Sequence, residues 1–231
     1  TAVGNNAMAS SASGSENVAI GSSALYHGDG GYQNVAVGAQ SMYSNTSSYE
    51  NTAIGYASLQ SITAGYQNLA AGKQALANLT TGYENVALGF NALRVNTSGF
   101  GNVVIGSQAG YVNTDGDRNV FIGYKAGYAE TGSDKLYIAN GTSINDRLLY
   151  GDFSDGTLNL GQESGTVSVL YDFAVTNDTT LSGNLDVAGN ASIAGNASIA
   201  GNTTLSSLNL SGAATFSNTV NIAGVLTTLS N

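Results

Sequence analysis

The stretch Asn17-Val18-Ala19-Ile20-Gly21 determines the fold, because variants of it return at a fixed interval along the chain. An Asn recurs every seventeen residues, and a Gly follows each Asn by four residues. The positions are Asn17, Asn34, Asn51, Asn68, Asn85, Asn102 and Asn119, and Gly21, Gly38, Gly55, Gly72, Gly89, Gly106 and Gly123. Self-similarity at this period is typical of a solenoid in which each repeat forms one coil.

Each repeat has two β-favouring segments. The first runs from the Asn to the Gly, as in NVAVG, NTAIG, NVALG and NVFIG, and the second is an Ala-Leu pair such as Ala24-Leu25 or Ala75-Leu76. Gly closes the first segment, which favours a turn there. The repeat therefore predicts two short strands and two turns per coil.

Alternation along a strand assigns the side chains of the first segment to two faces. Val18 and Ile20 share one face and Ala19 takes the other. We expect the Val18 and Ile20 columns to stack into the core, and the small Ala19 column to let another chain approach closely. The Ala19 column becomes bulky at Val104 and Phe121, so packing is expected to change there.

The repeated Gly and Asn residues are interpreted as structural. Glycine supplies the positive φ or tight corners that such a short coil needs. Asn side chains at one corner of every coil can hydrogen-bond along the stack as a ladder.

A second period of six residues begins at Gly183, in GNLDVA, GNASIA, GNASIA and GNTTLS. Each unit has one strong apolar residue at its fifth position, as at Val187 and Ile193. A single chain with coils of about 18 residues would complete fewer than three of them here, which is too few for a stable stack. Three chains winding together would give each level a core. This segment therefore predicts an obligate homotrimer.

The resulting fold class is all-β, with three regions. Residues 1–128 form a repetitive parallel β-roll solenoid with 17-residue coils, residues 129–176 a short β junction, and residues 177–231 a triple-stranded intertwined β-helix stem. In the junction, LYIAN at Leu136–Asn140 looks like a decayed repeat. Leu158–Leu160 and Val167–Val169 are predicted as short antiparallel strands.

Composition excludes several classes of function. The chain has 6 Lys and Arg against 15 Asp and Glu, which leaves no basic stripe for nucleic acid. No run of about 18 apolar residues is present, so membrane insertion is not expected. The absence of Cys removes disulfides and thiolate metal sites.

Neither catalytic, metal nor cofactor residues are predicted, and the chain is not expected to be an enzyme. His27 is the one histidine, so neither a His cluster nor a Ser-His-Asp arrangement is available within a chain. The oxygens of NTDGDRN, at 113–119, could face calcium from one side of a loop, but a solvated turn fits better because the EF-hand ligand set is incomplete. The recurring Glu16, Glu50 and Glu84 are interpreted as a solvated edge rather than a glycosidase pair.

Aromatic residues form a further column at Tyr32, Tyr49, Tyr66, Tyr83 and Phe100. Such a column can bind sugars, but bracing of a turn is the preferred interpretation. The less regular Tyr26, Tyr43 and Tyr111 are the candidate receptor-contact residues.

The reiterated N-[VT]-A-[IV]-G, the Ala-Leu pair and the leading G-Y-[QE]-N resemble the left-handed β-roll heads of trimeric autotransporter adhesins. They resemble still more the repeat arrays of bacteriophage tail fibres. The segments LYIAN, LLYGDFSDGTLNLG and GNLDVAGNASIAGN are similar to distal tail-fibre stems. The resemblance covers roughly residues 1–128 and the stem-like segments.

This resemblance implies a structural fibre protein of a phage tail, or of a related injection device, that forms a trimeric shaft and mediates attachment to the host cell surface. The expected partners are two further copies of the chain, other tail proteins and a host surface glycan or protein, and the expected location is the extracellular virion. The alternatives are the head of a bacterial surface adhesin, whose gene would continue into a stalk and barrel, and a polysaccharide-degrading tailspike. The array starts inside a repeat, so a fragment is expected, and the resemblance places a self-cleaving chaperone after Asn231.

Overall fold

The computed structural model describes residues 1–11, 13–143, 146–160, 175 and 179. The six-residue period and Val167–Val169 lie outside these described residues, so the stem prediction stays a prediction. The strands and turns described in this section all lie in one compact unit, Thr1–Asp172. Within the described part of the chain, no helix has the length and apolar character needed to cross a membrane.

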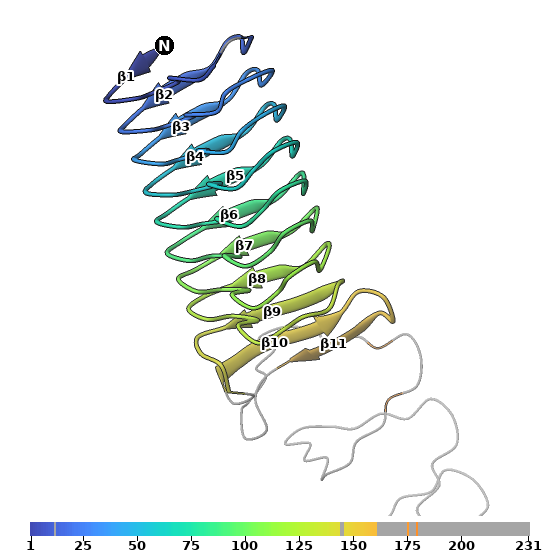
Figure 1. Ribbon diagram of the computed structural model, residues 1–231. Helices are drawn as coiled ribbons and strands as arrows, with labels where there is room; N and C mark the ends of the chain where they lie inside the picture. The colour runs from blue at the N-terminus through green and yellow to red at the C-terminus, as the bar shows by residue number, and fades with distance from the viewer. Residues whose placement is uncertain (12, 144–145, 161–174, 176–178, 180–231) are drawn as a thin grey trace, which may run out of the picture. The chain divides into compact units, whose positions relative to one another are not determined.

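Eight short strands, one per coil, stack in chain order into a parallel β-solenoid, and the predicted 17-residue coil is confirmed (Figure 1). Successive strands pair in parallel with a constant register, so that Val18 pairs with Val35 and Val35 with Thr52. The strands are β1 Ala2–Val3, β2 Val18–Ile20, β3 Val35–Val37, β4 Thr52–Ile54, β5 Leu69–Ala71, β6 Val86–Leu88, β7 Val103–Ile105 and β8 Val120–Ile122.

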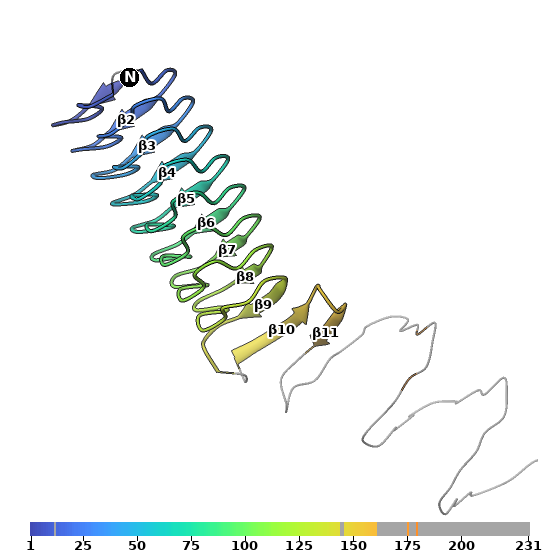
Figure 2. The ribbon, with the colours of Figure 1, turned by 45° about the vertical axis from the view of Figure 1, so that its right-hand side comes forward.

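A three-stranded extension closes the C-terminal end of the solenoid. Strand β9 (Lys135–Ala139) pairs in parallel with β8, which confirms LYIAN as a continuation of the repeat. Strands β10 (Arg147–Asp152) and β11 (Thr157–Leu160) then add antiparallel to it, as expected for Leu158–Leu160. Figure 2 shows β10 and β11 following β9 at the end of the stack.

The expected assignment of the strand faces is wrong. The centre of each strand faces the interior: Ala19 is fully buried, whereas Ile20 is 41% exposed and Val18 only half-buried. The reason is the width of the coil. The opposite wall contributes Leu25, Met42, Leu59, Leu76 and Leu93, all fully buried, and only small side chains at the strand centre leave room for them.

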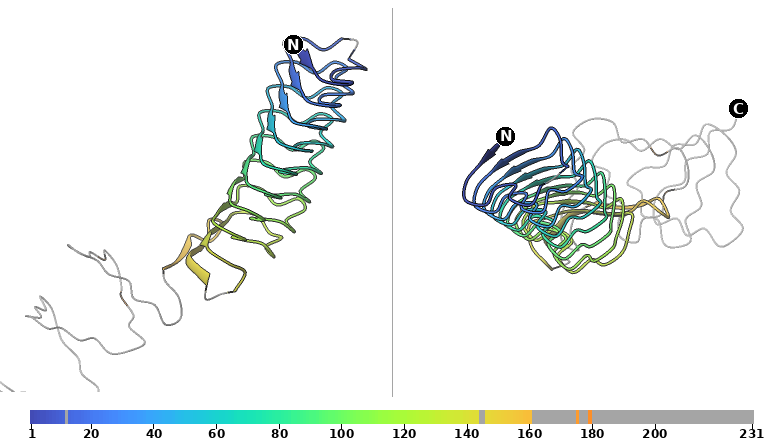
Figure 3. Two further views of the ribbon diagram at one scale, coloured as in Figure 1. Left: turned by 90° about the vertical axis from the view of Figure 1, so that its left-hand side faces the viewer. Right: turned by 45° about the horizontal axis from the view of Figure 1, so that its top comes forward.

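The Ala-Leu segment is hydrogen-bonded between coils but is not the predicted second strand. It alternates the sign of φ, with Ser23 at φ 55° and Leu25 at φ 51°. The Leu25 amide donates to the carbonyl of Ser41 in the next coil, so the backbone groups are paired without an extended strand. This alternation turns the chain sharply and places both Ala24 and Leu25 inside the coil. Figure 3 shows the strands along one side of the stack and connecting turns along the other.

Packing does change at the end of the array, as expected. Phe121 occupies the strand centre and is fully buried, and the turn column changes from Leu to Gly at Gly110 and Gly127. A Cβ atom at Gly127 would lie 2.8 Å from Cγ of Phe121, and one at Gly110 would lie 3.0 Å from Cδ2 of the same ring. The ring therefore fills the space that the Leu side chains fill in earlier coils.

The glycine corner is confirmed as a place where only Gly fits. Gly89 has φ +141°, and a Cβ atom there would lie 2.5 Å from the carbonyl oxygen of Gly106 in the next coil. A side chain would thus collide with backbone that cannot move away.

The asparagine ladder is confirmed as well. Asn85 Nδ2 donates to Oδ1 of Asn68 at 3.0 Å, while Asn85 Oδ1 accepts from the backbone amide and Nδ2 of Asn102 at 3.0 and 2.9 Å. Asn85 Nδ2 also donates to the carbonyl of Gly99 at 2.8 Å. The buried side-chain amides of this ladder are stable because each one is hydrogen-bonded and shared between coils.

Candidate functional site

The candidate receptor residues Tyr26 and Tyr43 lie side by side in successive coils. Their rings stack with centroids 5.2 Å apart, and the exposed His27 ring stands edge-on to both. Both tyrosines are half-buried. They form one small aromatic patch at the N-terminal end of the solenoid.

Tyr111 belongs to the same column of the repeat, but the structure does not bring it to that patch. It lies four coils beyond Tyr43, since 111 − 43 = 68 and each coil has seventeen residues. Its ring stacks on Tyr128 at 5.3 Å, and Arg94 Nη1 donates to its hydroxyl at 2.8 Å. Tyr128 and Arg94 were missed by the sequence analysis, although their seventeen-residue offset from Tyr111 would have indicated them.

The regular aromatic column forms a continuous stack along the rod. Neighbouring rings from Tyr32 to Phe100 lie 4.8 to 5.0 Å apart and nearly parallel, and the Arg118 guanidinium sits 5.4 Å from the Phe100 centroid. Each inner ring thus has both faces covered, so a sugar cannot stack on it. This arrangement agrees with the bracing interpretation.

The repeated glutamates lie beside this stack on an exposed edge. Gln33 Nε2 donates to Glu16 and Gln67 Nε2 donates to Glu50, each at 2.9 Å. A glutamine therefore separates successive glutamates of the column, and the structure does not bring two of these carboxylates to one point.

In the loop at 113–119, the side-chain oxygens accept hydrogen bonds from different partners. Asn113 Oδ1 accepts from the Gly116 amide, Asp117 Oδ1 from the Phe100 amide, and Asn119 Oδ1 from the Lys135 amide. Among the described residues, no group of three or more His, Cys, Asp or Glu side chains is placed to hold a metal ion.

The outer side of β2 to β8 forms an exposed apolar surface, here called the sheet face. It consists of the first and third residues of each strand, and none of these is charged. Several are well exposed: Ile20 at 41%, Ile54 at 46%, Val103 at 37%, Ile105 at 39% and Ile122 at 36%. Soluble single chains rarely leave such a long apolar strip uncovered.

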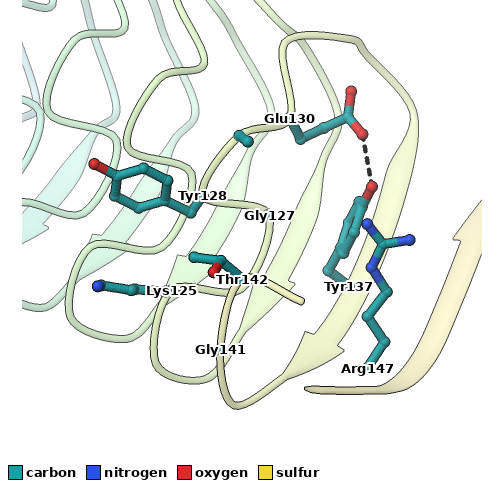
Figure 4. Close-up of a pocket in the computed structure, with 9 residues that line it drawn as sticks. Lys125, Gly127, Tyr128, Glu130, Tyr137, Gly141, Thr142 and Arg147 are labelled. Atoms are coloured by element: carbon teal, nitrogen blue, oxygen red, sulfur yellow. Dashed lines mark hydrogen bonds between the residues drawn. The ribbon is translucent and has the colours of Figure 1, made fainter. Parts of the chain in front are cut away.

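A pocket of about 90 Å³, here called the cap pocket, opens where β9 and β10 close the solenoid (Figure 4). Lys125 and Tyr128 line it from the last turn of the array, and Tyr137 and Arg147 line it from β9 and β10. Figure 4 shows Tyr137 and Arg147 side by side, with Glu130 bonded to the tyrosine.

Tyr137 is the fixed centre of the cap pocket. It is 7% exposed, its hydroxyl donates to Glu130 Oε2 at 2.8 Å, and the Arg147 guanidinium lies 4.8 Å from its ring centroid. Burial, and then the bond to Glu130, raise the pKa of Tyr137 well above its ordinary value. The phenol therefore stays neutral and acts as a hydrogen-bond donor at physiological pH.

Comparison of the chain with protein-family models, with curated proteins and with solved structures found no significant match to any of them.

Proposed function

We propose that this chain is a structural fibre segment of a phage tail or related injection device, and that three identical copies form a shaft that attaches to the host cell surface. The observation that carries this proposal is the sheet face, an uncharged apolar strip that repeats over seven successive strands. A strip of this kind is stabilised by a partner that covers it along its whole length.

Another copy of the same chain is the partner that fits the strip best. The apolar side chains recur at the spacing of the coils, and a second solenoid repeats with the same spacing. Side chains of one copy can therefore interdigitate with those of another at every level. The resemblance of the repeats to tail fibres, and the six-residue period that needs three chains, support a trimer rather than a dimer.

The mass in solution tests the assembly. Light scattering coupled to size-exclusion chromatography of the full 231-residue chain should give three times the 23.3 kDa chain mass. A folded species of single-chain mass at micromolar concentration would overturn the proposal.

A pair of matched variants tests the interface. Ile105→Asp places a charge in the sheet face and should shift the mass toward single chains. Ser98→Asp, at an exposed turn whose column already has Asp115, should leave the mass unchanged. Equal behaviour of the two variants would exclude the sheet face as the interface.

Attachment is tested separately. Fluorescently labelled full chain should bind to cells of some strains in a panel of bacteria and be displaced by excess unlabelled chain. Trimers that bind to none of the strains would count against the attachment role and leave the assembly standing.

A further inference from the structure

We propose that the outer face of strands β10 and β11, here called the end hairpin, packs on the same hairpin of neighbouring copies and fixes how far each copy is shifted along the next. This inference rests on the proposed function, because the partner is a second copy of this chain. It adds an interface beyond the repeats, in the last strands of the described sheet (Figure 2).

The sheet face does not end where the repeats end. Leu136 of β9 pairs with Val120 on the outer side of β8, and Ile138 follows two residues later on the same side. Residues that pair across strands share a face, so the pairing carries this side on to β10 and β11. The outer positions of the three strands are Leu136, Ile138, Leu149, Gly151, Leu158 and Leu160. This side therefore stays uncharged although the chain direction reverses at β10.

The charged and amide side chains lie on the inner side of these strands. There Lys135 forms an ion pair with Asp152, and Asn159 lies on that side as well. The outer Leu158 and Leu160 are nonetheless 57% and 51% exposed. An antiparallel sheet with one face in water normally turns its apolar residues to the covered side. The outer side of the end hairpin is therefore the side that fits a partner.

A β-bulge in β10 produces this arrangement. The pairing with β9 shifts between Arg147 and Leu149, so Leu148 is the extra residue. Without the bulge, Leu149 would pair with Tyr137 on the inner side, because a shift of one residue turns every side chain to the other face. The bulge keeps the leucine outside and the Tyr150 ring inside, where it lies 4.9 Å from Tyr137.

The repeats alone do not determine the shift between two copies. The outer positions of β2 to β8 are uncharged in every coil, so a shift by one coil, about 4.8 Å, presents a nearly equivalent surface. Within the described residues, the end hairpin occurs once. Its leucines meet those of another copy only when the copies are parallel and unshifted. Burial of Leu158 and Leu160 therefore favours that one arrangement.

Photo-crosslinking of the full chain tests the interface. Benzoylphenylalanine takes the place of Leu158, or of Asn159 on the inner side of the same strand as the control. A crosslink between copies gives a covalent dimer on a denaturing gel, and peptide mass spectrometry locates it. The probe at 158 should give dimers joined to residues 157–160 of the other copy, and the probe at 159 should lose them.

A probe at Ile122 tests the shift, because it lies in β8 and outside the hairpin. In the parent chain its crosslinks should fall on β8 of the other copy. Leu158→Asp should spread them to β7 and β9, since the copies can then slide. Asn159→Asp, the matched control, should leave them on β8. If Leu158→Asp fails to assemble, Leu158→Ser takes its place with the same expectation.

The contrary results separate this inference from the proposed function. A parent chain of single-chain mass would sink the proposed assembly and this interface with it. In assembled chains, a probe at 158 that gives no dimer, or that joins only its own copy, would overturn the interface alone. Crosslinks from Ile122 that stay on β8 in Leu158→Asp would refute the role in fixing the shift.

Discussion

A coil of the solenoid can fill its interior with a large side chain either from the strand centre or from the turn opposite. Moving that side chain from one wall to the other is the sharpest test of how the interior is packed. Early coils pair Ala at the strand centre with Leu in the turn, as at Ala87 and Leu93, whereas the last coil pairs Phe121 with Gly127. Phe121→Ala should empty the space of a whole ring and cost about 3–5 kcal/mol of unfolding free energy. Part of this cost is the edge contact with Tyr137, at 5.5 Å between centroids.

The single change Gly127→Leu should also destabilise the chain, for the opposite reason. Its Cβ would lie 2.8 Å from the Phe121 ring, so the coil is overpacked at a cost of about 1–3 kcal/mol. The backbone adds little, because Gly127 has φ 59° and Leu93 holds the same column at φ 47°.

Together the two changes recreate the pairing of the earlier coils. The double variant should therefore be more stable than the sum of the single costs predicts, with a coupling of about 1–3 kcal/mol. Urea unfolding of the full chain followed by circular dichroism measures the global effect, and amide hydrogen exchange in β7 to β9 measures the local one. The exposed Ser98→Ala is the control. Costs that add within about 0.5 kcal/mol would refute the idea that Phe121 replaces the leucine side chain.

Three further perturbations test the ladder, the ion pair and the corner. Asn85→Ala removes four hydrogen bonds and leaves the buried Asn102 amide without its acceptor. It should therefore lower the free energy of unfolding, measured in urea, by about 2–4 kcal/mol. The control Asn78→Ala, at an exposed position, should cost almost nothing. Hydrogen bonds from Lys135, then from Ser154, lower the pKa of Asp152 to about 2 from 3.8, so its contribution to stability is present above pH 3.8 and is lost as the pH falls through 2. Asp152→Asn should therefore be less stable than the parent at neutral pH and equal to it near pH 2, and a constant difference across that range would contradict the ion pair. Gly89→Ala should disrupt the stacking of the coils around β6 and β7, because its Cβ would lie 2.5 Å from the backbone of the next coil. Amide hydrogen exchange in these strands should then be fast. Amides protected as well as in the parent chain would rule out the close approach.

The seventeen-residue period predicted how the candidate tyrosines are related, but it did not predict the cap pocket. The seventeen-residue offset groups Tyr26, Tyr43 and Tyr111 in one column, and the sequence analysis singled them out as irregular. The cap pocket could not be predicted, because Lys125, Tyr137 and Arg147 come from segments that keep no common period. Tyr137 and Arg147 lie together only because β10 runs antiparallel to β9 and returns the chain to the end of the solenoid.

By itself, the sequence determined the coil length, the glycine corner and the asparagine ladder, since each depends on identical residues at one interval. Positive φ at Gly89 and amide pairing at Asn85 are local requirements that any stack with this period must meet. Which face of the strand points inward was decided by tertiary structure alone. Alternation divides Val18 and Ala19 between two faces but does not say which face is inside. The choice depends on Leu25 and its column, which cross a narrow interior and leave room only for alanine on the opposite wall.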